Sequence, residues 1–524
     1  MAELTHRQKL TVLSGLMLGM FLASLDTTVV VTAIRTIGDD LHGLSEQVWV
    51  TTAFLVTATI FTPIFGKLSD IYGRKRLYLV SIAIFIVGSL LCSLATSMYM
   101  LAVFRAIQGV GAGGITPLIF AILADIISPR ERARYQSYYL TVYAASAMAG
   151  PLVGGFFAEA DTILGIDGWR WIFLINVPLG AASYVVAKVV LKLEHHRLDH
   201  RIDWRGAVLL VVAVLPILLV AEQGRLWGWD SPGAWACYLI GVAGVALFVV
   251  SQWRMGDEAL VPVRMFRSST VSLGSLHTVV TGMVLLGGVA VVPLYLQIAK
   301  GATPAESGLL LAPLMVVNLL SAYVVGRSIG RSGRYRIFPI VGAGCFVAAL
   351  VWLARVGADT PLWQTALVLS VFGIGQGLSL FPVMIAMQNE VEPRDIGVVT
   401  AANTFFRSIG ATLGTALFLS ILFARTDEEL APIDDEIRAG LPAGAPEPTL
   451  DDSTWISLLP DALERRVLVG FADATNTVFA VAAGIAVLAF VLALLIKERP
   501  LRTTSGAEAA RVAREAAAAE SAAG

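Results

Sequence analysis

Residues 66–76 read GKLSDIYGRKR, and residues 326–336 read GRSIGRSGRYR. Each stretch follows one long apolar run and precedes another. The glycines and arginines recur at the same spacing, since Gly66, Gly73, Arg74 and Arg76 return as Gly326, Gly333, Arg334 and Arg336. A second echo pairs Pro129-Arg130-Glu131 with Pro393-Arg394-Asp395. Two apolar halves that repeat in the same order predict two helical bundles facing each other, which is the usual frame of a solute transporter.

The composition predicts a membrane protein. Of 524 residues, 56% are hydrophobic and only 15% are charged, whereas soluble domains carry about 25% charged residues. A net charge of −1 gives no sign of a nucleic-acid partner. The first apolar run, residues 11–34, is too long for a cleaved signal peptide, so we expect it to be retained as a span. The three cysteines lie in apolar segments and are expected to be buried small side chains rather than a disulfide framework.

Fourteen runs are long enough to span a bilayer, which takes about 20 mostly apolar residues. They lie near 11–34, 46–66, 77–97, 101–124, 136–158, 171–191, 205–221, 234–253, 271–296, 306–326, 337–356, 362–388, 397–424 and 474–496. Lysine and arginine concentrate in the connections after even-numbered spans, which predicts that both termini are cytoplasmic. The echo matches spans 1–6 with spans 9–14, so the expected fold is all-α in a 6+2+6 plan.

This plan divides the chain into four parts. Residues 1–200 are expected to form one six-helix bundle, residues 201–267 two inserted helices, and residues 268–499 a second six-helix bundle. An outer loop, 425–473, contains Pro442, Pro446 and Pro448 and many acids and is expected to be partly ordered. The tail, 500–524, is rich in Ala, Glu and Arg and is expected to be a frayed helix or disordered.

Several motifs resemble those of the major facilitator superfamily, in particular its fourteen-span drug:proton antiporters. They are GKLSDIYGRKR itself, LDTTVVVTA at 25–33, RAIQGVGAGG at 105–114, GPLVGG at 150–155 and WRWIFLINVP at 169–178. Their order and their places in the spans make the resemblance specific. The family pattern usually has Asn where Val31 stands and Pro where Arg35 stands, so these two positions depart from it.

Asp26 is the only acid in the first span, about 22 Å from its inner end and about 13 Å from its outer end at 1.5 Å per residue. A carboxylate at that depth must be paired or protonated. Low dielectric favours the neutral acid and a nearby cation favours the carboxylate, so water reaching Asp26 from alternate sides would change its proton occupancy. The alternative is an acid that only holds a neighbouring helix.

Two arginines lie at comparable depth. Arg105 is expected to approach Asp26, with Gln108 one turn away on the same helix face, and the resemblance implies a role for Arg105 in proton coupling. The alternative for Arg105 is a snorkelling interfacial side chain. Arg407 falls near the middle of span thirteen and must face the bundle interior or a wet cavity. With Asn403 one turn earlier, it is expected to line a substrate cavity, where an anionic group or Asp26 would be its partner.

Gly66, Asp70, Gly73 and Arg74 are implied by the resemblance to form a clasp that holds the bundles in the outward-facing state. The alternative is a solvated loop that sets topology. Gly150, Pro151, Gly154 and Gly155 give span five a small-residue face, and Gly410 and Gly414 give span thirteen a similar one. Such faces allow close helix packing, and we expect contact between spans of opposite halves. His277, Asn318 and Gln376 are polar residues in apolar spans and are further candidates for the cavity, or hydrogen-bonded packing residues.

These features predict a multi-pass exporter of the bacterial plasma membrane, in which inward proton movement drives an amphipathic organic compound outward and confers drug or antibiotic resistance. The proton gradient would supply the energy, since no phosphate-binding loop is present, and no cofactor or metal site is expected. The partners would be the substrate, protons and the lipid bilayer, and the protein would act as a monomer. The alternatives are a dedicated exporter of one lipid or natural product and, in another class, an intramembrane enzyme or receptor. The last is disfavoured because HExxH is missing from the sequence and no histidine or cysteine cluster is placed for chemistry.

Overall fold

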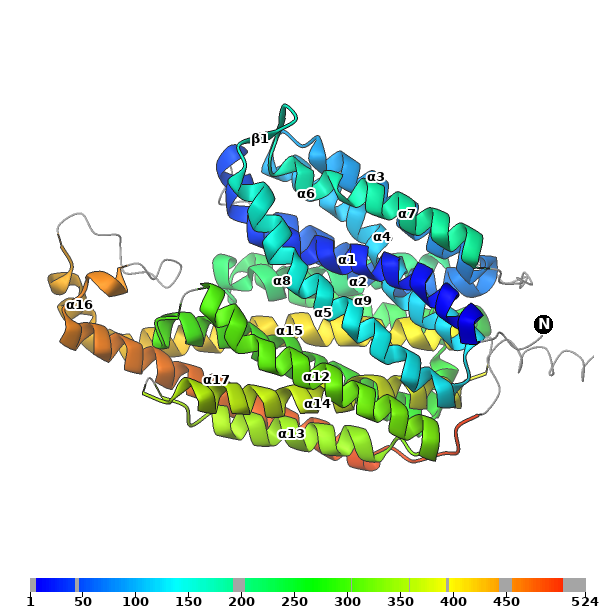
Figure 1. Ribbon diagram of the computed structural model, residues 1–524. Helices are drawn as coiled ribbons and strands as arrows, with labels where there is room; N and C mark the ends of the chain where they lie inside the picture. The colour runs from blue at the N-terminus through cyan, green and yellow to red at the C-terminus, as the bar shows by residue number, and fades with distance from the viewer. Residues whose placement is uncertain are drawn as a thin grey trace, which may run out of the picture.

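The computed structural model describes residues 6–42, 47–191, 203–302, 304–357, 359–392, 395–442 and 455–502, and these form a bundle of long helices (Figure 1). The helices are α1 (His6–Asp40), α2 (Gln47–Tyr72), α3 (Arg74–Ser93), α4 (Met98–Ile126), α5 (Pro129–Glu159), α6 (Arg170–Leu174), α7 (Asn176–Val190), α8 (Trp204–Trp227), α9 (Pro232–Met255), α10 (Ser269–Gly282), α11 (Gly288–Leu294), α12 (Pro304–Ser332), α13 (Ile337–Leu353), α14 (Leu362–Glu390), α15 (Ile396–Leu430), α16 (Asp434–Gly440) and α17 (Asp461–Leu495).

The shorter elements join these helices. A two-stranded antiparallel hairpin, β1 (Thr162–Ile163) and β2 (Ile166–Asp167), links α5 to α6. The π-helical segments η4 (Met283–Gly287) and η5 (Tyr295–Ala299) interrupt the helix that runs from α10 through α11. Short 3₁₀ turns are η2 (Gly256–Glu258), η3 (Val263–Arg267), η7 (Ala431–Ile433) and η8 (Ile456–Leu458).

Twelve stretches of the described chain are helical, long enough and apolar enough to cross a membrane. The chain is therefore a multi-pass membrane protein. The first stretch, Leu10–Ile34, corresponds to the first predicted span, and the turn predicted between spans three and four lies between α3 and α4. Two further long helices run beside these twelve: the shorter apolar helix α13, and α5, which begins with Pro129 in its first turn. Proline suits that position because its missing N–H has no helical acceptor there.

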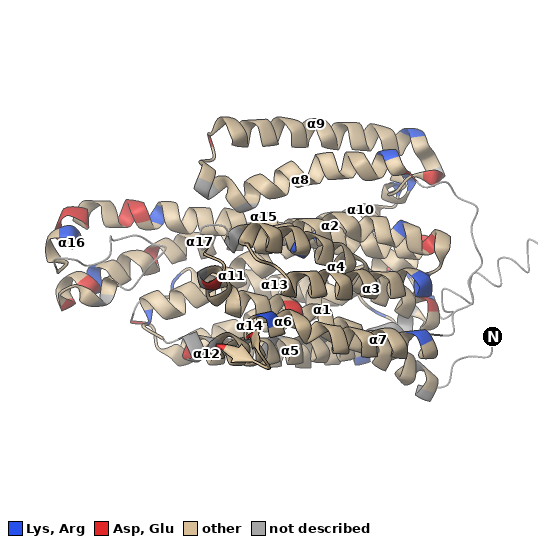
Figure 2. Cartoon of the chain, turned by 90° about the horizontal axis from the view of Figure 1, so that it is seen from above, with Lys and Arg blue, Asp and Glu red and all other residues tan. Residues whose placement is uncertain are grey.

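The helices pack in two groups with matching order. In the N-terminal group, α1–α7, helix α4 lies between α2 and α3, and α1 packs on α5 and α7. In the C-terminal group, α10–α17, helix α14 lies between α12 and α13, and α15 packs on α10 and α17. Contact between the groups runs through α2 with α15, α5 with α12 and α14, and α4 with α15. Helices α8 and α9 lie side by side on one flank, where α8 covers the seam between α2 and α15 and α9 packs on α8 (Figure 2).

Glycines allow α4 to sit close to both neighbours. A Cβ atom on Gly113 would lie 2.5 Å from the Ala58 carbonyl oxygen of α2, and one on Gly111 would lie 2.5 Å from the Phe85 nitrogen of α3. No side chain fits at such distances, so the glycine-rich stretch brings three backbones together. This close packing places the polar residues at the start of α4 beside α1 and α7.

The two ends of the bundle differ. We call the end at which α1 begins the near end, and the end at which α1 finishes the far end. At the far end α15 and α17 continue beyond their neighbours and meet α16 (Figure 1), enclosing a small apolar core around Trp455, Ile433 and Ile437. The described parts of the predicted outer loop, 425–442 and 455–473, are thus largely helical. A partly ordered loop stays a prediction for 425–473 as a whole, and in the described parts apolar residues bury a small core of their own.

The last described residues cross the near end of the C-terminal group. The Tyr335 hydroxyl donates to the Lys497 carbonyl (3.3 Å) and accepts from the Arg499 amide (2.9 Å). Asn389 bonds both Pro500 (3.1 Å) and Arg502 (2.9 Å). Residues 497–502 therefore form an ordered strap over the ends of α12, α13 and α14, whereas the rest of the predicted tail, 503–524, lies outside the described residues.

Candidate functional site

A fully buried polar cluster lies inside the N-terminal group, built around Asp26 of α1. The Arg105 guanidinium donates to one carboxylate oxygen of Asp26 (Nη1 to Oδ2, 2.6 Å). The other oxygen, Oδ1, accepts from the Gln108 amide (2.8 Å) and from the Asn176 amide (2.7 Å). All four side chains are at most 2% exposed. The structure thus brings Asp26 and Arg105 into direct contact, as the sequence analysis expected.

The cluster extends outward from these bonds. Arg105 also donates to the Gln108 carbonyl oxygen (2.7 Å), and its guanidinium lies 4.0 Å from the centre of the Phe54 ring of α2. Asn176, the first residue of α7, donates to Ser89 of α3 (3.0 Å). Helices α1, α2, α3, α4 and α7 therefore all contact one network, in which a change at Asp26 is felt on five helices.

The hydrogen-bond pattern around Asp26 is incompatible with an added proton. An ionised carboxylate only accepts hydrogen bonds, and here it accepts three. A protonated Asp26 would present a hydroxyl donor toward at least one donor group, and Arg105 would lose its buried counter-charge. Proton binding must therefore move at least one of Arg105, Gln108 and Asn176, which couples protonation to helix packing.

Arg407 lies apart from this cluster, at the junction of the two groups. Its guanidinium contacts the hydroxyl of Tyr139 on α5, while Arg407 itself belongs to α15. The side chain is half-buried. Among the residues that the structure describes, the ion pairs do not include Arg407, and Asp26 forms its ion pair with Arg105 instead. The suggested Asp26–Arg407 pair is therefore not formed in this conformation, because Asp26 bonds to Arg105, Gln108 and Asn176, which all lie in the N-terminal group.

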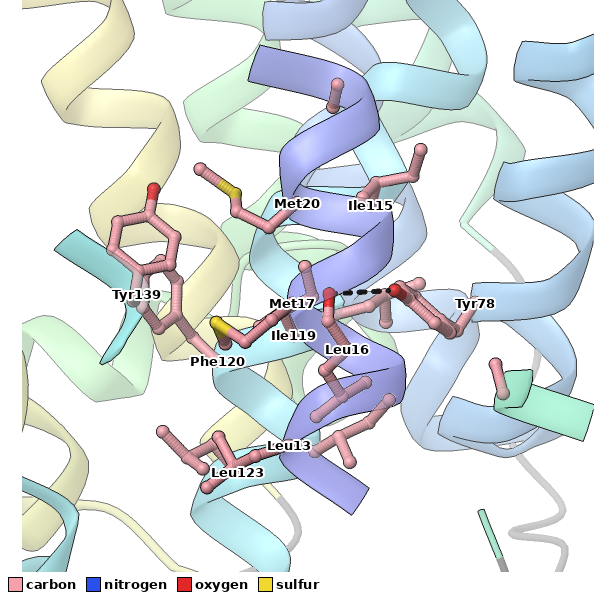
Figure 3. Packing of buried hydrophobic residues seen from close by; sticks show 14 of the residues in the cluster. Leu13, Leu16, Met17, Met20, Tyr78, Ile115, Ile119, Phe120, Leu123 and Tyr139 are labelled. Atoms are coloured by element: carbon pink, nitrogen blue, oxygen red, sulfur yellow. Dashed lines mark hydrogen bonds between the residues drawn. The ribbon is translucent and has the colours of Figure 1, made fainter. Parts of the chain in front are cut away.

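Around Tyr139, aromatic and sulfur-containing side chains of both groups meet. The Tyr139 ring lies 4.6 Å from Phe120 of α4 and 5.9 Å from Phe381 of α14, measured between centroids. Met17 and Met20 of α1 approach the same ring (Figure 3). These side chains are buried, so the junction between the groups is closed at this level.

The clasp residues form a second closed contact at the near end. Arg74 pairs with Asp70 (3.3 Å) and Asp125 (2.9 Å), and it also donates to the Ala121 carbonyl. The Asp70 carboxylate lies against Gly397, in the first turn of α15, so closely that a Cβ there would collide with it. The unpaired N–H groups at a helix start favour a negative charge. Asp70 thus joins α2 of one group to α15 of the other.

The two clasp positions Gly66 and Gly73 require glycine for different structural reasons. Gly66 packs directly on Ala401 of α15, and an added Cβ would collide with the alanine methyl group. Gly73 has a φ of 96° between α2 and α3, and its repeat partner Gly333 has a φ of 71° between α12 and α13. L-residues with side chains rarely adopt such values, which explains why glycine recurs there.

The small-residue faces pack within each group. Cβ atoms added to Gly150 and Gly154 would meet Thr28 and Val29 of α1, whereas one on Gly155 would meet nothing within 4 Å. Gly410 and Gly414 press against Val279 and Met283 in the same way. The expectation of contact between opposite halves is wrong for these faces, since each closes a pair within its own group, α1 with α5 or α10 with α15. Pro151 lies within α5, and its side chain is not among those described.

The other candidates for a substrate cavity are placed as follows. Gln108 belongs to the Asp26 cluster. Asn403 is buried and donates to Thr278 of α10 (2.9 Å), and the Nδ1 atom of His277 lies 3.1 Å from the Ala489 carbonyl of α17, so both join helices of the C-terminal group. Asn318 and Gln376 are half-buried, and each has a buried side-chain oxygen without a hydrogen-bond partner. These two remain candidates for a polar contact with a ligand.

Sequence reasoning missed three members of the site. Asn176 was inside a quoted motif, but an asparagine at the start of a helix has many ordinary uses. Ser89 and Tyr139 carry no signal beyond a polar atom in an apolar run. Their roles depend on which helices are neighbours, which the sequence did not specify. Of the second echo, Asp395 precedes α15, whereas Pro393 and Arg394 lie outside the described residues.

Comparison with known proteins gives a consistent family. The family model described as Major Facilitator Superfamily matches residues 16–415. An MFS-type transporter of Mycobacterium tuberculosis is 33% identical over 492 residues, covering 94% of this chain and 70% of the relative. Multidrug resistance protein 3 of Bacillus subtilis is 29% identical over 505 residues (94% and 96%), and the efflux pump dotC of Dothistroma septosporum is 30% identical over 504 residues (94% and 84%).

Solved structures agree in fold. The proton:xylose symporter XylE superposes with a TM-score of 0.61 at 14% identity, covering 97% of this chain and 99% of that one. The human organic anion transporter MFSD10 superposes with a TM-score of 0.60 at 14% identity, covering 93% and 99%. At such identities the likeness concerns the path of the chain.

Proposed function

The chain belongs to the major facilitator superfamily, and from that premise we propose that it is a proton-coupled exporter of amphipathic organic compounds. The superfamily consists of transporters, so the protein is a transporter and not an enzyme. Two relatives that are 29% and 30% identical to this chain are named multidrug resistance protein and efflux pump. These names support outward transport of small molecules. The observation that carries the proton-coupled part is the sealed ion pair of Asp26 and Arg105, joined to five helices.

The proposed arrangement has fourteen spans in the bacterial plasma membrane. The twelve candidate spans are completed by α5 and α13, which lie among them. The near end faces the cytoplasm, because the connections at that end carry most of the lysines and arginines of the short connections. Helices α1–α7 and α10–α17 act as the two moving bodies, and α8 with α9 forms the insertion between them.

In this proposal the described conformation is open to the outside. The groups meet at the near end through Gly66 with Ala401, Asp70 with Gly397, and Tyr139 with Phe381. A cycle of alternating access must break these contacts and form others at the far end. Asp70 contributes to the closed state through the α15 helix start, and Arg74 holds the Asp70 side chain in place.

The proton acts on the same cycle. Asp26 takes up a proton from the outside, releases its three donors and so loosens the packing of α1 against α4 and α7. When the groups have rocked, Asp26 is wetted from the cytoplasm and loses the proton, and the cluster forms again. The direction of transport follows from the proton gradient, because the groups rock inward only with the proton bound and return outward only with the exported compound bound.

The proposal is tested with purified protein in proteoliposomes, using ethidium as a cationic probe and dansyl-undecanoate as an anionic one. An imposed pH gradient should drive net movement of at least one probe in the wild type and of neither in Asp26→Asn. The matched control is Asp473→Asn, which changes an exposed acid on α17 and should transport normally. Gradient-driven transport by Asp26→Asn at the wild-type rate would refute the coupling role.

A further inference from the structure

We propose that Arg407 and the Tyr139 hydroxyl form a head-group site for the single negative charge of an amphipathic anion, such as a carboxylate, sulfonate or phosphate monoester on an apolar body. This inference rests on the proposed export function and names its substrate class. The proposed site would bind amphipathic anions in preference to amphipathic cations.

The first argument is the balance of charge deep in the membrane. Among the described side chains of the bundled helices, three charged residues lie deep in the membrane, more than six residues from a helix end: Asp26, Arg105 and Arg407. The other described charges lie nearer the helix ends or, like Asp473, on the parts of α15 and α17 that extend beyond their neighbours at the far end. Asp26 and Arg105 neutralise each other at 2.6 Å. One positive charge, that of Arg407, is left over.

The second argument is the place of that charge. Arg407 is eleven residues from the start of α15, which is about 16 Å of helix rise and so roughly half of a hydrocarbon core about 30 Å thick. An arginine at this depth is costly unless it faces water, a protein partner or a ligand. The hydroxyl of Tyr139 is a neutral neighbour of Arg407, and a neutral group does not balance the charge. An anion bound there would.

The third argument is the surroundings of the pair. Tyr139, the neighbour of Arg407, belongs to a buried cluster that also contains Phe120, Phe381 and Met20. Thioether and aromatic surfaces adapt to apolar bodies of different shape. A polar head at Arg407 with an apolar body against these side chains is the geometry of an amphiphile.

The fourth argument is the lack of a counter-charge for a cation. The carboxylate of Asp26 is 0% exposed and is enclosed by Arg105, Gln108 and Asn176. A cationic compound between the groups would approach Arg407 without reaching Asp26. Like charges at this depth repel strongly because the local dielectric is low, so the site selects against cations as well as for anions.

Binding is measured by fluorescence in phosphatidylcholine nanodiscs with full-length protein, and empty nanodiscs give the partition background. The two probes share a fluorophore and a chain and differ in head group: dansyl-undecanoate and dansyl-undecylammonium. The variants are Arg407→Gln, which removes the charge, and Arg407→Lys, which keeps it. The matched control is Arg425→Gln, because Arg425 lies eighteen residues further along α15, on the same helix face five turns away, exposed and paired with Glu428 at 2.6 Å.

The wild type should bind the anionic probe about ten-fold more tightly than the cationic one, because a charge-assisted hydrogen bond is stronger than a neutral one. Arg407→Gln should abolish that preference, Arg407→Lys should keep most of it, and Arg425→Gln should match the wild type. Equal affinity for the two probes in the wild type, or an unchanged ratio in Arg407→Gln, would overturn the inference. The inference would also be overturned if Arg407→Gln lost binding of both probes while Arg407→Lys kept binding of both. The charge of Arg407 would then stabilise the fold and would not select the ligand.

Transport separates this inference from the proposed function. Gradient-driven movement of ethidium but not of dansyl-undecanoate would leave proton-coupled export standing and refute the anion site. Preferential binding of dansyl-undecanoate through Arg407, without gradient-driven movement of either probe, would support the anion site and refute proton coupling. Asp26→Asn should keep the preference for the anionic probe, since Asp26 and Arg407 belong to separate sites.

Discussion

Replacing Gly66 by alanine should shift the transporter away from the state described here. The added Cβ would lie 3.2 Å from the Gly397 carbonyl oxygen and would collide with the Ala401 methyl group. Methyl groups pack at about 3.5–4.0 Å, so α2 and α15 must separate by roughly 1 Å. Neither neighbour can rotate away, because one is a backbone carbonyl and the other a Cβ atom.

Overpacking of this kind costs about 1–3 kcal/mol. Here the cost falls on the near-end-closed state alone, because Gly66 and Ala401 belong to different groups and separate when the near end opens. A difference of that size changes the ratio of the two states by about 5- to 150-fold. We therefore expect Gly66→Ala to populate the near-end-open state.

The shift is measured by the distance between two spin labels, with the native cysteines replaced by alanine. Labels at Arg76 in the first turn of α3 and at Arg334 between α12 and α13, both exposed, report on the near end. Labels at Thr96 and Leu362 report on the far end. In Gly66→Ala the near-end distance should lengthen and the far-end distance should shorten.

The control is Gly155→Ala, because nothing lies within 4 Å of its added Cβ. Both substitutions gain the same helix propensity, about 0.8–1 kcal/mol, so they differ only in the collision. Distance distributions in Gly66→Ala that match those in Gly155→Ala would refute the assignment of this contact to one state of the cycle.

Three other substitutions test the remaining contacts. Arg105→Gln should lower the free energy of unfolding in detergent by about 3–5 kcal/mol, because Asp26 loses its buried counter-charge. Adding Asp26→Asn to this variant should recover part of the loss. Additive effects of the two substitutions in this double-mutant cycle would count against a coupled pair. Tyr335→Phe should cost about 1–3 kcal/mol and expose the strap to protease, since the Arg499 amide loses its acceptor; an unchanged cleavage rate would show that the strap is held otherwise. Asp70→Asn should weaken the closed near end by about 0.3–1 kcal/mol, the worth of a charge at a helix start, seen as a longer near-end distance; no change would mean that hydrogen bonding alone holds α15.

Much of the helical framework follows from simple sequence rules. Long apolar runs mark the spans, and the recurrence of Gly73 as Gly333 has a backbone cause in the positive φ of both residues. The approach of Arg105 to Asp26 was also predictable, because two opposite charges at similar depth in a membrane are far more stable together than apart.

The remaining features depend on which helix faces which. Asn403 and Arg407 are one turn apart on α15, yet Asn403 bonds Thr278 within its own group and Arg407 reaches Tyr139 in the other. The faces of Gly150 and Gly410 were assigned to the wrong neighbours, since small residues permit close packing without choosing a partner. The helical order of residues 425–442 and 455–473 at the far end was missed because their apolar residues are too few for a span and bury only a small core.

Infrared difference spectroscopy of the Asp26 carboxyl tests the central claim most directly. The wild-type protein and Asp26→Asn are titrated in lipid from alkaline to acidic pH, and their spectra are subtracted. We predict that a protonated carboxyl C=O band belonging to Asp26 appears at acidic pH, and that binding of a transported compound changes its intensity. A difference spectrum that stays the same at every pH, with and without the compound, would show that Asp26 does not exchange a proton and would contradict the account.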